Sequence, residues 1–237
     1  MSKRLRIGLV AEGPLDAIVI KAALDAFLPP YTLSTLQPES TNPRFGGGWG
    51  GVLKWCHEVR KRNPGSLTDD PLLANIDVLI LHLDGDVAYG SYSDCGSLPA
   101  GDHGWRPLPC SSPCPPAKDT CDNVAQTLRS WLGTVDPGNR TVFCVPAMSG
   151  GAWLAAAILP AGHRLLSGCP ECELELEDSL GSLKKSHRIK KCKKDYDAHA
   201  KYVTDKWVDV RSMCSQAERF QSDMAMICNS LIADGQC

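Results

Sequence analysis

The sequence contains no long hydrophobic stretch and no excess of positive charge. No segment approaches a run of about 18 apolar residues, the length that spans a membrane, so we expect no transmembrane helix. The apolar run near the N-terminus stops at Glu12, which is too short for a secretory signal, and a cytoplasmic protein is therefore expected. With a net charge of −2, the chain has no global field that attracts nucleic acid, so any nucleic-acid surface must be local.

A phosphate-binding P-loop is also absent. The run Arg44–Gly51 contains five glycines, but no Gly-Lys-Ser/Thr follows it. A flexible loop is the preferred interpretation of this run, and a close backbone approach to a ligand, such as a phosphate at the start of the next helix, is the alternative. We find no internal repeat and no coiled-coil heptads.

Cysteine, by contrast, is abundant, with 12 residues in the chain of 237. Without an export signal, reduced thiols or metal ligands are expected rather than disulfides. Two sets of side chains could bind Zn²⁺. The tidier set is a CxxC motif with two later ligands, namely Cys169, Cys172, His187 and Cys192. The other set is Cys95, His103, Cys110, Cys114 and Cys121. Neither set contains paired CxxC motifs, so scattered free thiols remain the alternative.

Hydrophobic periodicity predicts strands and helices in alternation. Strands are expected at residues 5–11, 31–36, 76–83 and 141–145, and helices at 15–28, 52–62, 120–132 and 152–159. The run 76–83 shows little polar alternation, which is typical of a central parallel strand. This order predicts an α/β fold with a mostly parallel, Rossmann-like sheet flanked by helices.

We expect the α/β domain to cover residues 1–160, with an irregular Cys/Pro/Gly-rich excursion at 89–118. Residues 161–237 are expected to form a charged segment and a helical C-terminal extension. A basic run in this part could contact a phosphate backbone, or it could be a solvated helix face partly neutralised by the preceding acidic run. The predicted nucleic-acid-binding residues are Lys184, Lys185, Arg188, Lys190, Lys191, Lys193 and Lys194.

Acidic side chains follow two of the predicted strands. Asp84 and Asp86 follow the strand at 76–83, and Glu12 and Asp16 follow the first strand. If these strands are parallel neighbours, both pairs lie at the carboxyl edge of one sheet, where open α/β folds place their sites. Carboxylate oxygens are the ligands that Mg²⁺ prefers, so the four residues predict a site for Mg²⁺ or Mn²⁺. The alternative is that Asp16 only favours a helix N-terminus and that residues 84–86 form a turn.

His82 comes directly before the second acidic pair. We predict that its side chain points away from the carboxylates and packs in the core.

The motifs Glu12-Gly-x-x-Asp16 and Asp84-x-Asp86, each after a strand, resemble the signature of Toprim domains, which topoisomerases, primases and overcoming-lysogenization-defect (OLD) nucleases share. The small size is similar to that of compact stand-alone OLD-like Toprim proteins of bacteria. The resemblance covers residues 5–160. It implies that Glu12 is a metal ligand or general acid/base, that Asp84 and Asp86 are Mg²⁺ ligands, and that Asp16 assists them. Glu12, Asp84 and Asp86 are thus the predicted catalytic residues.

The sequence departs from this family pattern after the fourth strand. Relatives often carry a further acid in a Ser-x-Glu-x-Trp-like segment, whereas Ser149-Gly150-Gly151-Ala152-Trp153 has glycine in that place. If the missing acid holds a second metal, this protein works with one metal, recruits a carboxylate from elsewhere, or is inactive.

These features together predict an Mg²⁺-dependent nuclease that cleaves phosphodiester bonds in DNA or RNA. The resemblance also implies a role in anti-phage defence, beside a separately encoded ATPase. A catalytically silent Toprim-like binding module is the first alternative. A small-molecule phosphotransferase ranks last, because Val87-Ala88 follows Asp86 where an Asp-x-Asp-x-Thr motif would need threonine. The number of subunits is left open.

Overall fold

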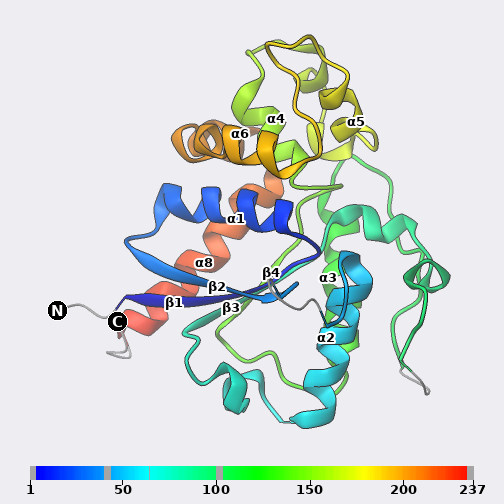
Figure 1. Cartoon of the computed structure of the whole chain (residues 1–237), viewed down its shortest axis with the longest axis vertical. Coiled ribbons are helices and arrows are strands. Elements are labelled where there is room, and N and C mark those ends of the chain that lie inside the picture. The colour runs from blue at the N-terminus through cyan, green and yellow to red at the C-terminus, as the bar shows by residue number, and fades with distance from the viewer. Residues whose placement is uncertain (1–3, 40–43, 64, 100–103, 234–237) are drawn as a thin grey trace.

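A computed structural model describes residues 4–39, 44–63, 65–99 and 104–233. Four strands form one parallel sheet in the order β2-β1-β3-β4 (Figure 1). They are β1 (Leu5–Val10), β2 (Tyr31–Gln37), β3 (Val78–His82) and β4 (Thr141–Cys144). The chain moves from β1 to β2 on one side and then crosses to β3 on the other side of β1. The carboxyl ends of β1 and β3 are therefore the topological switch point of the sheet.

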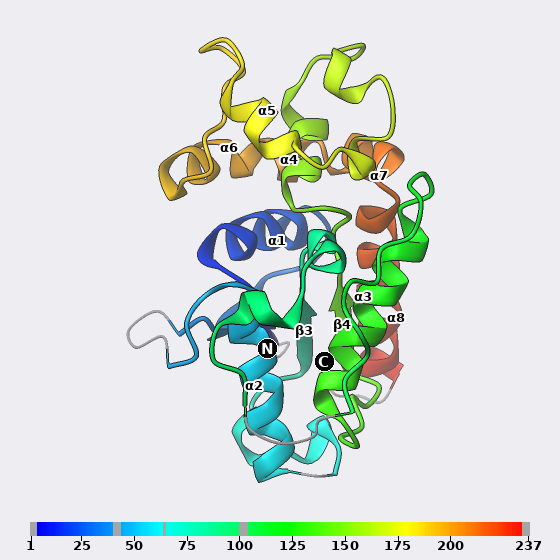
Figure 2. The same cartoon turned by 90° about the vertical axis from the view of Figure 1, so that its right-hand side faces the viewer.

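Helices cover both faces of this sheet, as the sequence predicts for an α/β fold (Figures 1 and 2). One face is covered by α2 (Gly48–Arg62) and α3 (Lys118–Leu132). The other face is covered by α1 (Pro14–Phe27), α4 (Gly151–Ile158), α6 (Lys193–Asp205), α7 (Trp207–Met213) and α8 (Ser215–Ala233). The short helix α5 (Leu176–Gly181) packs against α4.

Side-chain alternation along the strands divides the core into two layers. Ile7 of β1 and Ile80 of β3 belong to the layer under α1 and α4, whereas Leu79 and Leu81 of β3 belong to the layer under α2 and α3. Every residue of β3 is buried, which confirms the predicted central strand. Residues 84–86 follow directly after the carboxyl end of this buried strand.

The segment after residue 160 completes the layer of helices over one face. Trp207 of α7 stacks on Phe27 of α1 with ring centroids 6.1 Å apart, and Phe220 of α8 lies 5.8 Å from Trp153 of α4. These rings belong to the same buried cluster as Leu9 of β1. The predicted helical extension is thus an integral layer, and the core does not divide at residue 160.

The glycine-rich run differs from the flexible loop that we preferred. Residues 48–51 form the first turn of α2, which begins four residues earlier than expected. A Cβ atom on Gly51 would lie 2.5 Å from the carbonyl oxygen of Gly46, and Gln37 Nε2 donates to that oxygen at 2.6 Å. The backbone N–H of Gly48 donates to the carbonyl of Glu12 at 2.8 Å. Close backbone packing accounts for Gly51, whereas Gly46 and Gly48 adopt positive φ values of 78° and 70° that favour glycine.

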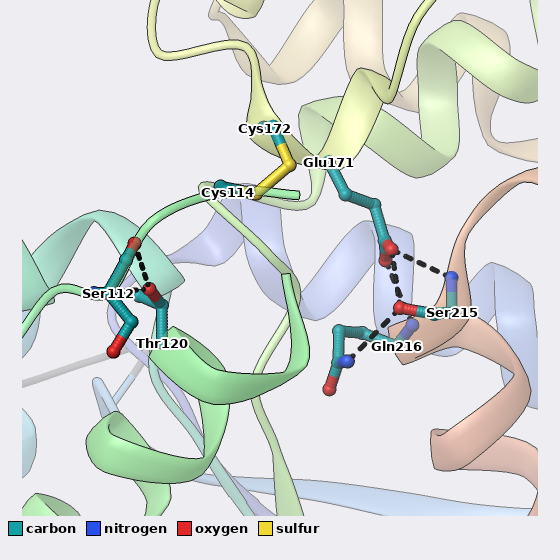
Figure 3. Close-up of a disulfide and its surroundings, with 7 residues drawn as sticks. All are labelled: Ser112, Cys114, Thr120, Glu171, Cys172, Ser215 and Gln216. Carbon is teal, nitrogen blue, oxygen red and sulfur yellow. Dashed lines mark hydrogen bonds between the residues drawn. A yellow bond between two sulfur atoms is a disulfide. The ribbon is translucent and has the colours of Figure 1, made fainter. Parts of the chain in front are cut away.

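The described parts of the excursion, residues 89–99 and 104–118, are irregular, as predicted, but side-chain contacts hold them against the domain. The Tyr92 hydroxyl donates to the carbonyl of Arg106 at 2.7 Å and accepts a hydrogen bond from Trp131 Nε1 at 3.0 Å. At its end, Cys114 forms a disulfide with Cys172, which lies 58 residues later in the chain (Figure 3). The expectation of reduced thiols is therefore wrong for this pair.

Candidate metal centre

The parallel pairing of β1 and β3 places Glu12 beside Asp84. Val10 is the register partner of Leu81, so the residues that follow these two strands emerge at the same edge of the sheet. The backbone N–H of Asp84 donates to Glu12 Oε1 at 2.8 Å. The two acidic motifs, 72 residues apart in the sequence, therefore meet directly.

Asp16 and His82 complete a group of potential metal ligands with Asp84. One ligand atom from each of the three residues lies within 4.8 Å of the other two. Asp16 is in the first turn of α1, and His82 is the last residue of β3. His82 Nε2 lies 3.4 Å from Asp84 Oδ1. The prediction that His82 points away is wrong, because side chains of an extended chain repeat every two residues and His82 and Asp84 share one side.

Two atoms of this group are buried without a hydrogen-bond partner. They are Asp84 Oδ1 and His82 Nδ1, in residues that are only 7% and 1% exposed. A buried polar atom without a partner costs about 1–3 kcal/mol and requires an explanation, such as a bound ion. Carboxylate oxygens and an imidazole nitrogen fit a divalent cation, but this donor set does not select one particular ion.

Burial and mutual repulsion raise the pKa values of these carboxylates. Burial, followed by the charge of Asp84, raises the pKa of Glu12 well above its usual range. Burial, followed by the charge of Asp16, raises the pKa of Asp84 to about 7. Burial alone would lower the pKa of His82, but the close contact with Asp84 and the charges of the neighbouring carboxylates outweigh it and raise that pKa. A divalent cation in this place would stabilise the ionised carboxylates.

Asp86 is anchored to the loop that follows β4. Its backbone N–H donates to the carbonyl of Met148 at 3.1 Å. Gly85 makes the approach possible, because a Cβ atom there would lie 2.7 Å from the backbone nitrogen of Met148. Met148 itself adopts a positive φ of 59°, which non-glycine residues rarely do. The loop at 146–150 thus supports the carboxyl end of β3.

The sequence did not single out Glu177 and Tyr196, which the structure brings to the same edge. The Tyr196 hydroxyl donates to Glu177 Oε1 at 2.7 Å, and Lys191 Nζ lies 2.5 Å from Glu177 Oε2. Burial raises the pKa of Asp86, Lys191 opposes this rise and Glu177 adds to it. The acidic run at 171–178 was visible in the sequence, but no pattern indicated which of its members would approach Asp86.

The predicted basic residues lie mostly in the connection between α5 and α6, and not on a helix face. Lys191 pairs with Glu177, and Lys193, the first residue of α6, lies 2.5 Å from Asp197. The other members are exposed, namely Lys184, Lys185, Arg188, Lys190 and Lys194. Through Lys191, this loop adjoins the acidic edge of the sheet.

The predicted zinc sites are not formed in the described part of the chain. The Cys172 sulfur is bonded to Cys114, so neither residue has a thiolate to offer a metal. This removes one ligand from each predicted set, and His103 of the second set lies outside the described residues. Glu171, next to Cys172, instead accepts hydrogen bonds from the backbone N–H groups of Ser215 and Gln216 at the start of α8, at 2.8 and 2.9 Å (Figure 3).

The fold and this edge define an α/β protein with a candidate cation site at the switch point of a parallel sheet. None of the protein-family models, curated proteins or solved structures compared with this chain matches it. Among the described residues, no helix is both long and apolar enough to cross a membrane.

Proposed function

We propose that this protein is a metal-dependent phosphodiesterase of the Toprim type, and that its substrate is nucleic acid. The observation that carries the proposal is the buried Asp84 Oδ1, which makes no hydrogen bond and lies in one group with Asp16 and His82. The backbone N–H of Asp84 donates to Glu12. Asp16, His82 and Asp84 would hold Mg²⁺ or Mn²⁺, with Glu12 and Asp86 beside them. The resemblance to OLD-like Toprim proteins extends the proposal to anti-phage defence, beside a separately encoded ATPase.

A cation bound there would polarise the phosphoryl oxygens and lower the pKa of a bound water. The side chains of the chain itself have distinct roles in this proposal. Asp84 and Asp16 fix the position of the positive charge at the switch point. Glu12, whose carboxylate accepts the backbone N–H of Asp84, would accept a proton from the attacking water once the charge of the cation keeps it ionised. The exposed lysines of the loop at 182–192 would contact the phosphate backbone.

A catalytically silent binding module is the second candidate function. It is favoured by one observation, the absence of an acidic side chain in the turn at Gly150 and Gly151. Tight binding of Mn²⁺ and nucleic acid without cleavage would support it.

Cleavage of labelled DNA and RNA with Mg²⁺ or Mn²⁺ tests the main proposal, with Asp84→Asn compared against wild type. Outer-shell partners of a metal are worth about 10–100-fold in affinity or activity, so removal of a ligand should cost at least that much. Asp69→Asn is the matched control, because Asp69 is exposed and lies in a short turn after α2. Equal cleavage by wild type and Asp84→Asn would refute the proposed site.

A further inference from the structure

The CxxC motif that begins at Cys169 forms a single helical turn beside the disulfide. The backbone N–H of Cys172 donates to the carbonyl of Cys169 at 2.9 Å and closes a 3₁₀ turn over Pro170–Cys172. Such a turn brings the Cα atoms of its first and fourth residues within about 7 Å and places their side chains on the same side. A disulfide can bridge two cysteines at this separation. Cys172 therefore lies within bonding range of two cysteines, Cys169 and its present partner Cys114.

The three cysteines are accessible to solvent, and Cys169 is a free thiol. Cys114, Cys169 and Cys172 are half-buried, whereas other free thiols, such as Cys56, are fully buried. Burial raises the pKa of Cys169, but the nearby backbone N–H groups of Glu171 and Cys172 oppose this rise. Disulfide exchange requires an attacking thiolate with access to the sulfur that it attacks. Cys169 is the free cysteine of the CxxC turn that meets this requirement.

The segments on both sides of the disulfide are held by hydrogen bonds that do not involve sulfur (Figure 3). In the excursion, the backbone N–H of Ser112 donates to Thr120 Oγ1 at 2.9 Å. Beside Cys172, the carboxylate of Glu171 accepts hydrogen bonds from the backbone N–H and the hydroxyl of Ser215, at 2.8 and 2.7 Å. These contacts would remain if Cys172 changed its partner, so an exchange at this sulfur does not require unfolding.

We propose that Cys169, Cys172 and Cys114 form a thiol–disulfide exchange site. The Cys169 thiol loses its proton to water, and its thiolate attacks the sulfur of Cys172. A bond forms between Cys169 and Cys172, the bond between Cys172 and Cys114 breaks, and Cys114 leaves as a thiolate that takes a proton from water. One thiol and one disulfide stand on each side of this reaction, so no oxidant or reductant is consumed.

The exchange turns the covalent link between the excursion and the C-terminal half into a reversible one. In one state Cys114 joins the two parts, and in the other the link lies within the CxxC turn and the excursion is held by noncovalent contacts alone. None of the three cysteines belongs to the candidate cation site, so this proposal does not depend on the proposed function.

Treatment of Cys114→Ser with an excess of oxidised glutathione tests whether the CxxC turn can close. Cys172 should first form a mixed disulfide with glutathione, which Cys169 then displaces, so peptide mapping by mass spectrometry should find Cys169 bonded to Cys172. In the matched variant Cys114→Ser/Cys169→Ser, the reaction should stop at the mixed disulfide. Any other state of Cys172 in Cys114→Ser would overturn the proposal. Circular dichroism checks that both variants are folded.

Slow labelling of the intact disulfide-bonded protein with a low concentration of a maleimide tests the exchange itself. The label on Cys114 should accumulate in wild type, together with a disulfide between Cys169 and Cys172, and should be lost in Cys169→Ser. Cys192→Ser, which removes an exposed free thiol, should behave like wild type. Equal labelling of Cys114 in wild type and Cys169→Ser would overturn the proposal.

Discussion

At the scale of the residue, the acidic edge is a place where burial raises the pKa of several carboxylates. The pKa values of Glu12, Asp84 and Asp86 are all raised, with burial as the first cause in each case. The pKa of His82 is raised as well, by the carboxylates around it. These groups therefore cost stability when they ionise without a cation, as expected for a site arranged for binding rather than for folding.

The free energy of unfolding without metal should accordingly fall as pH rises from about 4 to 7. In that window an unfolded Asp has lost its proton, whereas Asp84, with a pKa raised to about 7, still holds it. The native state binds more protons, so stability falls with pH. His82 contributes in the same direction, because its protonated form is favoured in the native state and that contribution is lost above its unfolded pKa.

Urea unfolding in EDTA between pH 5 and 8 measures this dependence. Asp84→Asn should show a shallower fall, and at pH 8 it should be at least as stable as wild type, because it removes a buried charge that no cation balances. Mg²⁺ should stabilise wild type more at pH 8 than at pH 5. Identical pH profiles for wild type and Asp84→Asn would contradict this account.

At the scale of the element, the site depends on how closely the turn after β3 approaches the loop after β4. A Cβ atom on Gly85 would lie 2.7 Å from Met148 N and 3.0 Å from Pro146 O, both backbone atoms that cannot move independently. Gly85→Ala should therefore destabilise the protein by about 1–3 kcal/mol and weaken Mn²⁺ binding, because residues 84 and 86 would shift.

Gly150→Ala is the matched control for that substitution. Gly150 has a helical φ of −57°, and an added Cβ would meet only Val19 side-chain atoms at 3.5 Å or more, which is ordinary contact. Thermal unfolding and Mn²⁺ titration of both variants provide the comparison. Equal behaviour of Gly85→Ala and Gly150→Ala would show that the close approach does not position the acidic residues.

The elements that the sequence predicts well are those whose pattern is local. The apolar run 76–83 identified β3, and the apolar period of residues 15–28 identified α1, because each pattern depends on residues close together in the chain. The neighbouring positions of Glu12 and Asp84 were inferred from the expected parallel order alone. Glu177 could not be inferred, because its approach to Gly151 depends on how α5 packs against α4. His82 could have been placed correctly from strand alternation, which puts it on the side of Asp84.

At the scale of the whole molecule, one covalent link joins the excursion to the C-terminal half. The disulfide between Cys114 and Cys172 closes a segment that contains α3, β4 and α4. Its removal in Cys114→Ser/Cys172→Ser should lower the free energy of unfolding by about 2–4 kcal/mol, since the cross-link restricts the unfolded chain. Cys192→Ser, at an exposed free thiol, should have no such effect. Equal unfolding midpoints for the double variant and wild type in non-reducing urea would argue against the link.

The distribution of charge over the molecule leads to the final prediction. The net charge is −2, so in the proposed function nucleic acid would have to be attracted locally, by the exposed lysines of the α5–α6 loop. Lys184→Ala/Lys185→Ala/Lys190→Ala should weaken binding at low salt. For duplex DNA it should also reduce the slope of log affinity against log salt by about 0.9 for each phosphate that the protein no longer neutralises. Fluorescence anisotropy at several salt concentrations, with Ca²⁺ in place of Mg²⁺, measures both quantities.

Lys201→Ala, on an exposed face of α6 where the lysine pairs with Asp205, is the control. An unchanged slope in the triple variant would place the nucleic-acid surface elsewhere. A reduced slope would place the loop that carries Lys191 on the phosphate backbone, next to the carboxylates that are proposed to cleave the nucleic acid.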